Sequence, residues 1–379
     1  MKTVKFAQVL KFSENLVKVD KPEEERYVTV LLYGRGVIER EIKEGKVPVA
    51  FTGYKAHAGQ LIISTINARN GAAGIIPTEL EGSVVSKDFP LFDIDRECVD
   101  EQYLLYYLWS DSFIHEAEQN SFGATMPRLH VKPFLNMQMR LPTLSEQKRR
   151  AHTLCHVESL LNTQRHLLTK LDELVKSRFV EMFGEPSINS MGWPMKPFAE
   201  TCTLLTGNTP PRAVKEYYGS YIEWIKSDNI TTSSLYLTKA AEYLSEEGAK
   251  VGRVVHTGTI LMTCIAGSLN TVGNVAIVDR DVAFNQQINA FIPQQYETMF
   301  LYVLLQLLKP RLHEAASSAL KCILNKGNLE SYAAIVPDME LQRQFSAFVA
   351  EVDKSKLAVK QSLEKLETLK KSLMQEYFG

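Results

Sequence analysis

Two stretches of this sequence match each other without a gap at a constant offset of 195 residues. The first opens with Pro142 and Gln147, and the second opens with Pro337 and Gln342. Both copies then carry leucine and lysine at helical spacing, and both end in Phe-Gly. Any two amphipathic helices share such spacing, but that does not explain the common opening and ending. We therefore interpret the match as an internal duplication, which limits the possible folds more than any other feature of the sequence.

Each copy is predicted to form one long helix, over residues 143–184 and 337–379. Apolar residues recur at every seventh position, a period that winds helices into a left-handed coiled coil. In the first helix they are Leu154, Leu161, Leu168, Val175 and Met182, with a second row at Leu160, Leu167 and Leu174, and in the second helix they are Phe345, Val352, Val359, Leu366 and Leu373. Polar Gln164, Lys356 and Lys370 interrupt the seam. Because the helices share length and register and are separated by a globule, we expect them to pair antiparallel within one chain.

The two remaining segments, residues 1–142 and 185–336, resemble each other more weakly. The run HAGQLII at 57–63 is similar to HTGTILM at 256–262. Short apolar runs bounded by turn residues predict strands, and a longer apolar stretch late in each segment predicts a helix. The predicted strands are 27–33, 60–64, 74–76, 222–226, 259–265 and 273–278, and the predicted helices are 100–119 and 297–308. The predicted fold class is therefore α+β: two mixed α/β domains separated by two long antiparallel coiled-coil helices, with a pseudo-twofold internal duplication.

Composition and charge disfavour several classes of protein. No run of about 18 apolar residues is present, so we expect no transmembrane helix, and the polar N-terminus does not resemble a signal peptide. The five cysteines are widely spaced and contain no Cys-x-x-Cys, which disfavours disulfides and zinc and favours a reducing cytoplasm. With a net charge of −1, any DNA binding has to come from local patches or from a basic partner.

Motifs for catalysis are missing from the sequence. There is no Gly-x-x-x-x-Gly-Lys-Ser/Thr loop for ATP. The stretch NTPPR at 208–212 superficially resembles the Asn-Pro-Pro-Tyr loop of amino-methyltransferases, but Thr209 separates the asparagine from the proline and Arg212 replaces the aromatic residue. The eight histidines show no metal-ligand spacing. We therefore expect no enzyme activity, metal or cofactor on this chain.

Four motifs follow one another along the chain. In chain order they are the run 59–74, the start of the first long helix at Leu141-Pro142-x-Leu144-x-Glu146-Gln147, its end at Phe183-Gly184-Glu185-Pro186, and Gly207-x-Thr209-Pro210 followed by YIEWIKSD at 221–228. Together with the doubled order of parts, they resemble the specificity subunit of a type I restriction–modification system, over nearly the whole chain. The sequence departs from that pattern at two points: the first segment lacks the Gly-x-Thr-Pro loop, and Leu341 replaces the glutamate before Gln342.

The resemblance implies a non-catalytic DNA-recognition subunit in the cytoplasm of a prokaryote. Residues 1–142 and 185–336 would be target recognition domains 1 and 2, each reading one half of a bipartite, asymmetric sequence in double-stranded DNA. Residues 143–184 and 337–379 would space these domains and dock two adenine methyltransferase (modification) subunits. Restriction–translocase subunits would complete the complex, and the partners would bind S-adenosylmethionine, ATP and Mg²⁺.

Polar and basic residues in loops are the candidate DNA-binding residues, because such groups reach base edges and phosphates in protein–DNA complexes. In the first segment they are Asn67, Arg69, Asn70 and Arg128, and in the second they are Thr209, Arg212, Lys226, Ser227, Asn229, Lys321, Asn325 and Lys326. The amides of Asn229 and Asn325 are suited to pair with adenine, and the lysines to contact phosphate. The alternative for each residue is a solvated charge or a turn; Thr209 and the two prolines after it are suited to fix a turn.

Two other functions are compatible with parts of the sequence. A coiled-coil scaffold that binds proteins and not DNA would use the heptads for homodimerisation, and the near-neutral charge favours it slightly. The duplicated segments argue against it, since a scaffold needs no pair of divergent readers. A self-contained methyltransferase or nuclease is disfavoured by the missing motifs. Salt-titrated DNA binding tests the scaffold, and S-adenosylmethionine binding by the isolated chain tests the methyltransferase.

Overall fold

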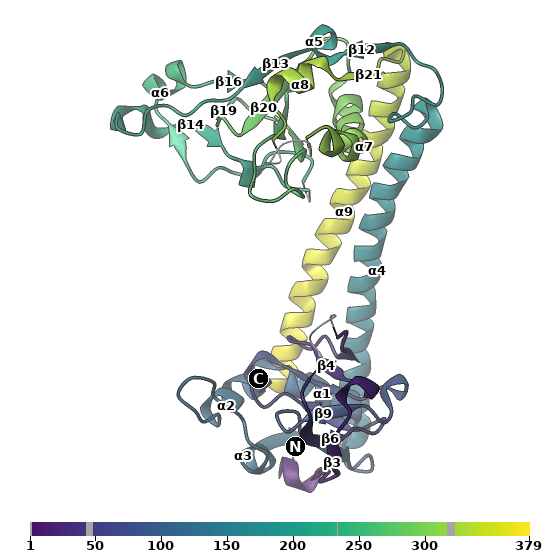
Figure 1. Ribbon diagram of the computed structural model, residues 1–379. Helices are drawn as coiled ribbons and strands as arrows, with labels where there is room; N and C mark the ends of the chain where they lie inside the picture. Colours follow the sequence, from purple (N-terminus) through teal and green to yellow (C-terminus); the bar gives the residue numbers. More distant parts are fainter. Residues whose placement is uncertain (1, 43–47, 233, 317–322) are drawn as a thin grey trace. The chain divides into compact units, whose positions relative to one another are not determined.

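The computed structural model describes residues 2–42, 48–232, 234–316 and 323–379 (Figure 1). The chain divides into two compact units. Unit 1 comprises Met1–Arg165 and Gln361–Gly379, and unit 2 comprises His166–Lys360. Each unit contains a mixed α/β domain and part of both long helices, which confirms the predicted fold class and its duplication.

Unit 1 consists of short strands and short helices together with the ends of the two long helices. Its strands are β1 (Lys2–Lys5), β2 (Leu10–Phe12), β3 (Leu16–Val19), β4 (Val28–Val30), β5 (Val37–Glu39), β6 (Phe51–Lys55), β7 (Leu61–Ile63), β8 (Ala73–Ile75), β9 (Val84–Ser86), β10 (Leu91–Ile94) and β11 (Gln138–Leu141). Its helices are α1 (Glu101–Leu108), α2 (Asp111–Gln119), α3 (Val131–Asn136), the first part of α4 (Leu144–Phe183) and the last part of α9 (Met339–Phe378), with 3-10 turns η1 (Phe6–Gln8), η2 (Pro22–Glu24), η3 (Ala68–Asn70) and η4 (Thr78–Leu80). The strand orders are β2-β10-β7-β8, β3-β6-β9, β1-β11 and β4-β5.

Strand β7 lies inside the largest of these sheets and is apolar throughout because both faces of the sheet are covered. Leu61 and Ile63 belong to one core, which includes the buried Tyr103 of α1. Ile62 points to the opposite face and belongs to a second core with Leu91 of β10. The predicted strand at 60–64 is therefore confirmed.

The predicted helix at 100–119 is in fact two helices, α1 and α2. Ser110 lies between them, and its Oγ accepts a hydrogen bond from the backbone nitrogen of Phe113 at 3.3 Å. This bond caps α2, as serine side chains commonly do at helix starts. Apolar residues continue across the break, so the sequence pattern alone does not show it.

Unit 2 repeats the framework of unit 1. Its strands are β12 (Met195–Pro197), β13 (Cys202–Thr206), β14 (Tyr218–Ile225), β15 (Tyr243–Leu244), β16 (Val254–Val255), β17 (Ile260–Thr263), β18 (Val275–Ile277), β19 (Val282–Phe284), β20 (Ile288–Pro293) and β21 (Ala333–Ile335). Besides the long helices, its helices are α5 (Phe198–Thr201), α6 (Glu246–Val251), α7 (Thr298–Ala316) and α8 (Lys326–Ser331), with 3-10 turns η5 (Lys215–Tyr217) and η6 (Ser227–Asn229). The orders β13-β20-β17-β18 and β12-β21 correspond to β2-β10-β7-β8 and β1-β11 of unit 1. The third sheet of unit 2 has the order β15-β14-β19-β16, in which β14 runs parallel to β19 and the antiparallel pair β16–β19 corresponds to β6–β9 of unit 1.

A buried glutamine fixes the start of α4 in unit 1. The Nε2 of Gln147 donates to the carbonyl oxygens of Cys98 at 3.1 Å and Pro142 at 2.9 Å. Its Oε1 accepts from the backbone nitrogen of Asp100 at 2.9 Å. The side chain thus joins the beginning of α4 to the loop before α1, and each of these three bonds satisfies a backbone group that would otherwise lose its partner.

The corresponding glutamine, Gln342, makes the same three bonds at the start of α9 in unit 2. Its Nε2 donates to the carbonyl oxygens of Gln295 at 3.4 Å and Pro337 at 2.8 Å, and its Oε1 accepts from the backbone nitrogen of Glu297 at 2.9 Å. Both glutamines are fully buried. The duplication inferred from Pro…Gln in the sequence is therefore present at the level of individual hydrogen bonds.

In unit 1, α4 and α9 lie side by side and antiparallel. Arg150 Nη1 donates to the carbonyl oxygen of Tyr377 at 3.2 Å, and Lys370 Nζ lies 2.6 Å from Glu158 Oε1. Residue numbers therefore rise along α4 as they fall along α9. Leu154, a member of the predicted heptad row, is completely buried in this part of the seam.

The same pairing holds in unit 2, as the position of the aromatic rings shows. Phe179 of α4 packs edge-on against Phe345 of α9, with ring centroids 5.4 Å apart. Lys356, which interrupts the heptad pattern, pairs with Asp172 of α4 at 2.7 Å. The predicted antiparallel pairing within one chain is confirmed. Because the helices occupy each other's seam, the heptads no longer support the homodimeric scaffold.

Candidate nucleic-acid interface

The loop that carries the Gly-x-Thr-Pro motif is bonded to the end of β19 and the start of β20 in unit 2. Backbone nitrogens of Gly207 and Asn208 donate to the carbonyl oxygens of Ile288 and Phe284, both at 3.1 Å. A Cβ atom at Gly207 would overlap the backbone oxygen of Asn285. The loop therefore approaches the β19–β20 connection so closely that only glycine fits at this position.

Two aromatic residues of β14 hold the next part of this loop. Tyr218 donates its hydroxyl to the carbonyl oxygen of Pro210 at 2.6 Å, and Trp224 Nε1 donates to the carbonyl oxygen of Asn208 at 3.3 Å. The guanidinium carbon of Arg212 consequently lies 4.7 Å from the ring centroid of Tyr218 and 4.9 Å from that of Trp224. A cation over an aromatic face is attracted by the ring, so these contacts orient the arginine.

A second cation and a carboxylate complete this group. Lys226 Nζ lies 5.2 Å from the ring centroid of Trp224 and forms an ion pair with Glu242. Glu242 also pairs with Arg212 at 2.8 Å. The hydrogen bonds from Lys226 and Arg212 hold the pKa of Glu242 below its usual value, so this carboxylate is charged at neutral pH. We call Arg212, Tyr218, Trp224, Lys226 and Glu242 the Trp224 cluster.

The structure assigns Asn229 to the fold of its own loop, which corrects the prediction that it reads a base. Its side chain is 7% exposed. The Oδ1 atom accepts from the backbone nitrogen of Lys226 at 3.0 Å, and Nδ2 donates to Thr238 Oγ1 at 3.3 Å and to the carbonyl oxygen of Lys239 at 3.1 Å. With its oxygen and nitrogen both engaged, the amide has no hydrogen-bonding edge to offer to DNA. Ser227 begins the same 3-10 turn and is partly exposed.

Thr209 lies within the loop and also contributes to its shape. Its Oγ1 forms a hydrogen bond with the side chain of Gln286, and the residue is partly buried. This bond joins the loop to the turn between β19 and β20 and is consistent with the turn-forming alternative for Thr209.

Asn325 and Lys326 belong to another part of unit 2. They start α8, which packs against α5 and β13 and lies apart from β14 (Figure 1). Asn325 Oδ1 accepts from the backbone nitrogen of Asn328 at 2.8 Å and caps the helix, and Lys326 pairs with Glu330 at 3.2 Å. Lys321 lies outside the described residues. The candidate residues of the second segment are thus not brought together in one group.

In unit 1, Asn67, Arg69 and Asn70 share the single turn η3. Asn67 precedes the turn, and its Oδ1 accepts from Nδ2 of Asn70 at 3.1 Å. Arg69 lies between them, is partly exposed, and has no hydrogen-bond or ion-pair partner within the described part of the chain. The two asparagines therefore shape the turn, and Arg69 is its available cation.

A glycine-rich turn packs directly on η3. We call residues 33–36 the Tyr33 turn. The backbone nitrogen of Tyr33 donates to the carbonyl oxygen of Asn70 at 2.8 Å, and that of Gly34 donates to Gly71 at 3.2 Å. A Cβ atom at Gly34 would lie 2.7 Å from the Trp109 ring, so glycine is required here. Tyr33 adopts a positive φ of 59° and is 73% exposed, so the turn presents a ring to solvent.

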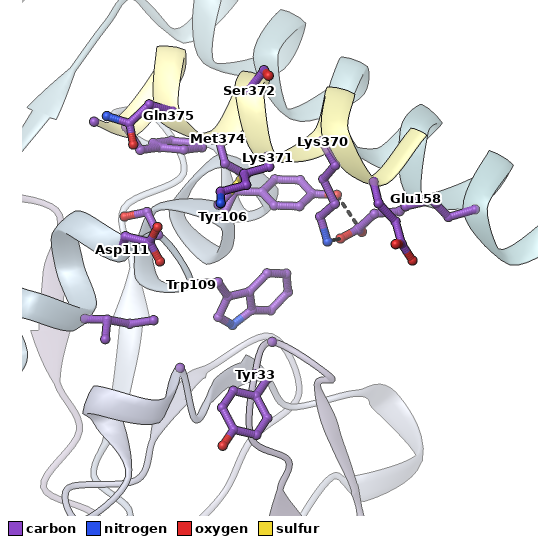
Figure 2. A pocket seen from close by; sticks show the side chains of 18 of the residues that line it. Tyr33, Tyr106, Trp109, Asp111, Glu158, Lys370, Lys371, Ser372, Met374 and Gln375 are labelled. Atoms are coloured by element: carbon purple, nitrogen blue, oxygen red, sulfur yellow. Dashed lines mark hydrogen bonds and ion pairs between the residues drawn. The ribbon is translucent and has the colours of Figure 1, made fainter. Parts of the chain in front are cut away.

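The Tyr33 turn borders a hollow of about 1170 Å³ in unit 1 (Figure 2). Figure 2 shows Trp109 between Tyr33 on one side and Lys370 of α9 on the other. Lys370 pairs with Glu158, which also accepts from the hydroxyl of Tyr106 at 2.8 Å. The hollow is therefore lined by aromatic rings and by both signs of charge.

Arg128, the remaining candidate of the first segment, is engaged in an ion pair. Its Nε lies 3.0 Å from Asp88 Oδ1, and about 38% of its side chain is exposed. Its backbone pairs with Phe122, which is exposed. The carboxylate of Asp88 therefore reduces the net charge that Arg128 offers to a phosphate.

In the Tyr33 turn and the Trp224 cluster, four residues named above were not predicted as site residues: Tyr33, Tyr218, Trp224 and Glu242. The sequence contains a signal for the first, since Tyr33 precedes two glycines separated by one residue. Trp224 lies within the motif YIEWIKSD at 221–228, but Glu242 has no local signal because it reaches the cluster through strand pairing.

Across the described ranges, no three His, Cys, Asp or Glu residues gather to hold a metal ion. Among the described residues, no helix is both long enough and apolar enough to cross a bilayer.

Comparison with known proteins identifies the family. The type I restriction modification DNA specificity domain matches this chain twice, over residues 1–173 and 191–369. The chain belongs to this family. The two matches correspond to the two copies of the repeat, so each copy is one specificity domain with its long helix.

Curated relatives of the family align with part of this specificity-domain protein. The type I restriction enzyme HindI specificity subunit of Haemophilus influenzae is 29% identical over 156 residues, which is 40% of this chain and 33% of the relative. The MjaIX specificity subunit of Methanocaldococcus jannaschii is 29% identical over 126 residues, or 32% of this chain and 28% of the relative. The chain thus spans a third or less of the length of these relatives.

Solved structures share the fold over the full chain. One comes from a study of complex assembly and conformational transition of the type I R-M system, with a TM-score of 0.62, 19% identity, and coverage of 100% of this chain and 97% of that one. Another is the type I S subunit from M. genitalium, with a TM-score of 0.56, 13% identity, and coverage of 100% and 96%. At these identities the similarity shows the fold.

Proposed function

We propose that this chain is the DNA-recognition subunit of a type I restriction–modification complex and has no catalytic activity of its own. Residues 1–142 and 185–336 are its two target recognition domains, and each reads one half of a bipartite, asymmetric target in double-stranded DNA. Residues 143–184 and 337–379 set the spacing of the domains and dock two adenine methyltransferase subunits.

The observation that carries this proposal is the pair of equivalent helix starts at Gln147 and Gln342. In each unit the same three glutamine hydrogen bonds join the domain to the start of a long helix. One chain therefore carries two DNA-recognition domains that are attached to their helices in the same way. The loops that these readers expose are different: unit 1 presents the Tyr33 turn, and unit 2 presents the Trp224 cluster. Equivalent frames with different loops are suited to two half-sites of different sequence.

The exposed groups have the chemistry that base reading needs. Arginine pairs with two acceptors of guanine in the major groove, and lysine and arginine also neutralise phosphates. Arg212 and Lys226 offer both functions in unit 2. In unit 1, Arg69 is the available cation, and the exposed ring of Tyr33 lies on the adjacent turn.

The chemical steps belong to partner chains in this proposal. Adenine methylation with S-adenosylmethionine takes place on the methyltransferase subunits, and ATP- and Mg²⁺-dependent translocation and cleavage take place on restriction subunits. The complex works in the cytoplasm of a prokaryote, where it meets chromosomal and incoming DNA.

Mapping of methylated adenines in the genome of the host tests the function. We expect one bipartite motif, with two defined halves around an unspecified spacer, to lose its methylation when the gene for this chain is deleted and to regain it on complementation. A complementing chain with Arg343→Gln, a change at the exposed ion pair with Glu297, is the control and should restore the motif. Unchanged methylation after deletion would refute the proposal.

A further inference from the structure

Two exposed cations of the Trp224 cluster share one carboxylate. Arg212 comes from the Gly207–Arg212 loop and Lys226 from the end of β14, and both pair with Glu242. The exposed fractions of the three side chains are 55%, 33% and 35%. The shared carboxylate reduces the charge that this surface presents to a polyanion from two positive charges to one.

Strand pairing places Glu242 beside the aromatic platform. The backbone nitrogen of Trp224 donates to the carbonyl oxygen of Glu242 at 3.0 Å, and the next residue, Tyr243, lies opposite Glu223 in the sheet. Because side chains alternate between the two faces of a strand, Glu242 shares the face of Trp224, and Tyr243 shares the face of Glu223. The carboxylate is therefore fixed where both cations reach it.

Glu223, on the other face, shows what a structural carboxylate looks like in the same sheet. It is 11% exposed, pairs with Arg280, and accepts hydrogen bonds from the backbone nitrogen of Ala240 at 3.1 Å and from the hydroxyl of Tyr243 at 3.3 Å. Glu242 differs from Glu223 in its partners. Among the described residues, its carboxylate contacts two solvent-facing cations, Arg212 and Lys226. Its side chain stabilises a charge arrangement at the surface and joins no buried network.

We propose that Glu242 is a specificity-determining residue of the second recognition domain, which orients Arg212 for base reading and screens Arg212 and Lys226 from DNA of the wrong sequence. This inference rests on the proposed function. Sequence-independent binding to DNA depends on the positive charge of the surface, and the negative charge of Glu242 lowers the affinity of that binding. At the correct half-site, the guanidinium of Arg212 is already held near the rings of Tyr218 and Trp224, and it donates to a base edge with little loss of freedom.

Glu242→Gln in the full chain, assembled with its methyltransferase partner, tests the inference. The probes are two duplexes, one with the genomically mapped target and one with its second half-site scrambled. We expect the variant to bind the scrambled duplex roughly 1.4- to fivefold more tightly, which is the range by which one exposed ion pair changes an equilibrium. The salt dependence of that binding should become steeper, and the ratio of target to scrambled affinity should fall.

Two further variants separate this role from a loss of charge or of structure. Glu24→Gln removes the same charge from the exposed Lys21–Glu24 pair of η2 and should leave the affinity ratio as in the parent. In a chain that already carries Arg212→Gln and Lys226→Gln, Glu242→Gln should leave the ratio of target to scrambled affinity unchanged, because the groups through which it affects the ratio are gone; the lost negative charge should raise the affinity for both duplexes alike.

The inference fails if Glu242→Gln changes the affinity ratio no more than Glu24→Gln does. It also fails if both duplexes lose affinity equally, since that result would indicate a structural role. A parent complex that does not distinguish the two duplexes would refute the proposed function itself, and the inference with it. A parent that does distinguish them, combined with an unaffected ratio in the variant, would refute the inference alone.

Discussion

The two units agree where they hold the long helices and differ where they meet solvent. Gln147 and Gln342 make the same set of bonds to equivalent carbonyl and amide groups. The exposed loops show no such agreement: unit 1 places the Tyr33 turn on Asn70, whereas unit 2 builds the Trp224 cluster from β14 and the Gly207–Arg212 loop. The two copies have thus kept the hydrogen bonds that attach each domain to its long helix, while their exposed loops have diverged.

This difference has a physical basis. A buried amide that satisfies three backbone groups cannot be changed without leaving some of them unpaired, which is costly in a buried site. An exposed arginine on an aromatic ring contributes little to folding, so its replacement alters binding and not the fold. The requirement for stability therefore restricts substitution of the buried glutamines, whereas the requirement for recognition restricts substitution in the exposed loops.

The largest effect is expected for the buried glutamines. Gln147→Leu and Gln342→Leu each leave an amide and two carbonyl groups unpaired, so each should lower the free energy of unfolding by roughly 2–4 kcal/mol. Urea denaturation measures this loss. Gln361→Leu, at an exposed position of α9, is the matched control and should have little effect. A large loss for one glutamine and none for the other would break the equivalence of the two frames.

Arg212→Gln is expected to affect one half-site only. Loss of a bidentate contact to a base costs about 1–3 kcal/mol and relaxes the preference at one position. Binding of the assembled complex to duplexes with single changes in each half-site measures both effects. Arg311→Gln, at an exposed ion pair with Glu314 on α7, is the control. Equal loss of preference in both half-sites would contradict separate readers.

Asn229→Ala should reduce stability and leave sequence preference unchanged. Its amide makes three hydrogen bonds inside the protein, so the variant should lose roughly 1–3 kcal/mol of unfolding free energy. Asn325→Ala, which removes an exposed helix cap, should cost about 1 kcal/mol. If Asn229→Ala folded as stably as the parent and changed the preference at one base, our assignment of this amide to the fold would be wrong.

The smallest effect is expected for Lys326. If it contacts a phosphate, Lys326→Gln weakens binding to all sequences alike and lowers the slope of log affinity against log salt by about 1. Lys354→Gln, on the exposed surface of α9, serves as the control. An unchanged slope would remove α8 from the interface and leave the Trp224 cluster as the reader of unit 2.

Much of the fold could be predicted from the sequence because it depends on period and repetition. The heptads predict both long helices, and the recurrence of Pro…Gln predicts that the helices start alike. The break at Ser110 could not be predicted, since apolar residues run through it and a single capping hydrogen bond decides it.

The candidate sites were predictable only in part. Arg212 and Lys226 were found because they lie beside a motif. Asn229 was misassigned because a short amide at a strand end serves equally well to close a turn. Tyr33 and Glu242 were missed because their neighbours are distant in sequence: Tyr33 rests on Asn70, and Glu242 reaches Arg212 by strand pairing. The glycines that follow Tyr33 indicate a turn but not its contact with Asn70, and Glu242 has no local pattern, because both contacts depend on tertiary structure.

The central claim, that two domains read two half-sites independently, is tested most directly by exchange of one domain. Residues 187–336 would be replaced by the corresponding segment of a relative whose target is known, with α4 and α9 retained. Methylated adenines would then be mapped in cells that carry the hybrid with its methyltransferase. We predict that one half of the target changes to that of the donor and the other half stays as in the parent. A hybrid that changed both halves, or neither, would contradict the claim.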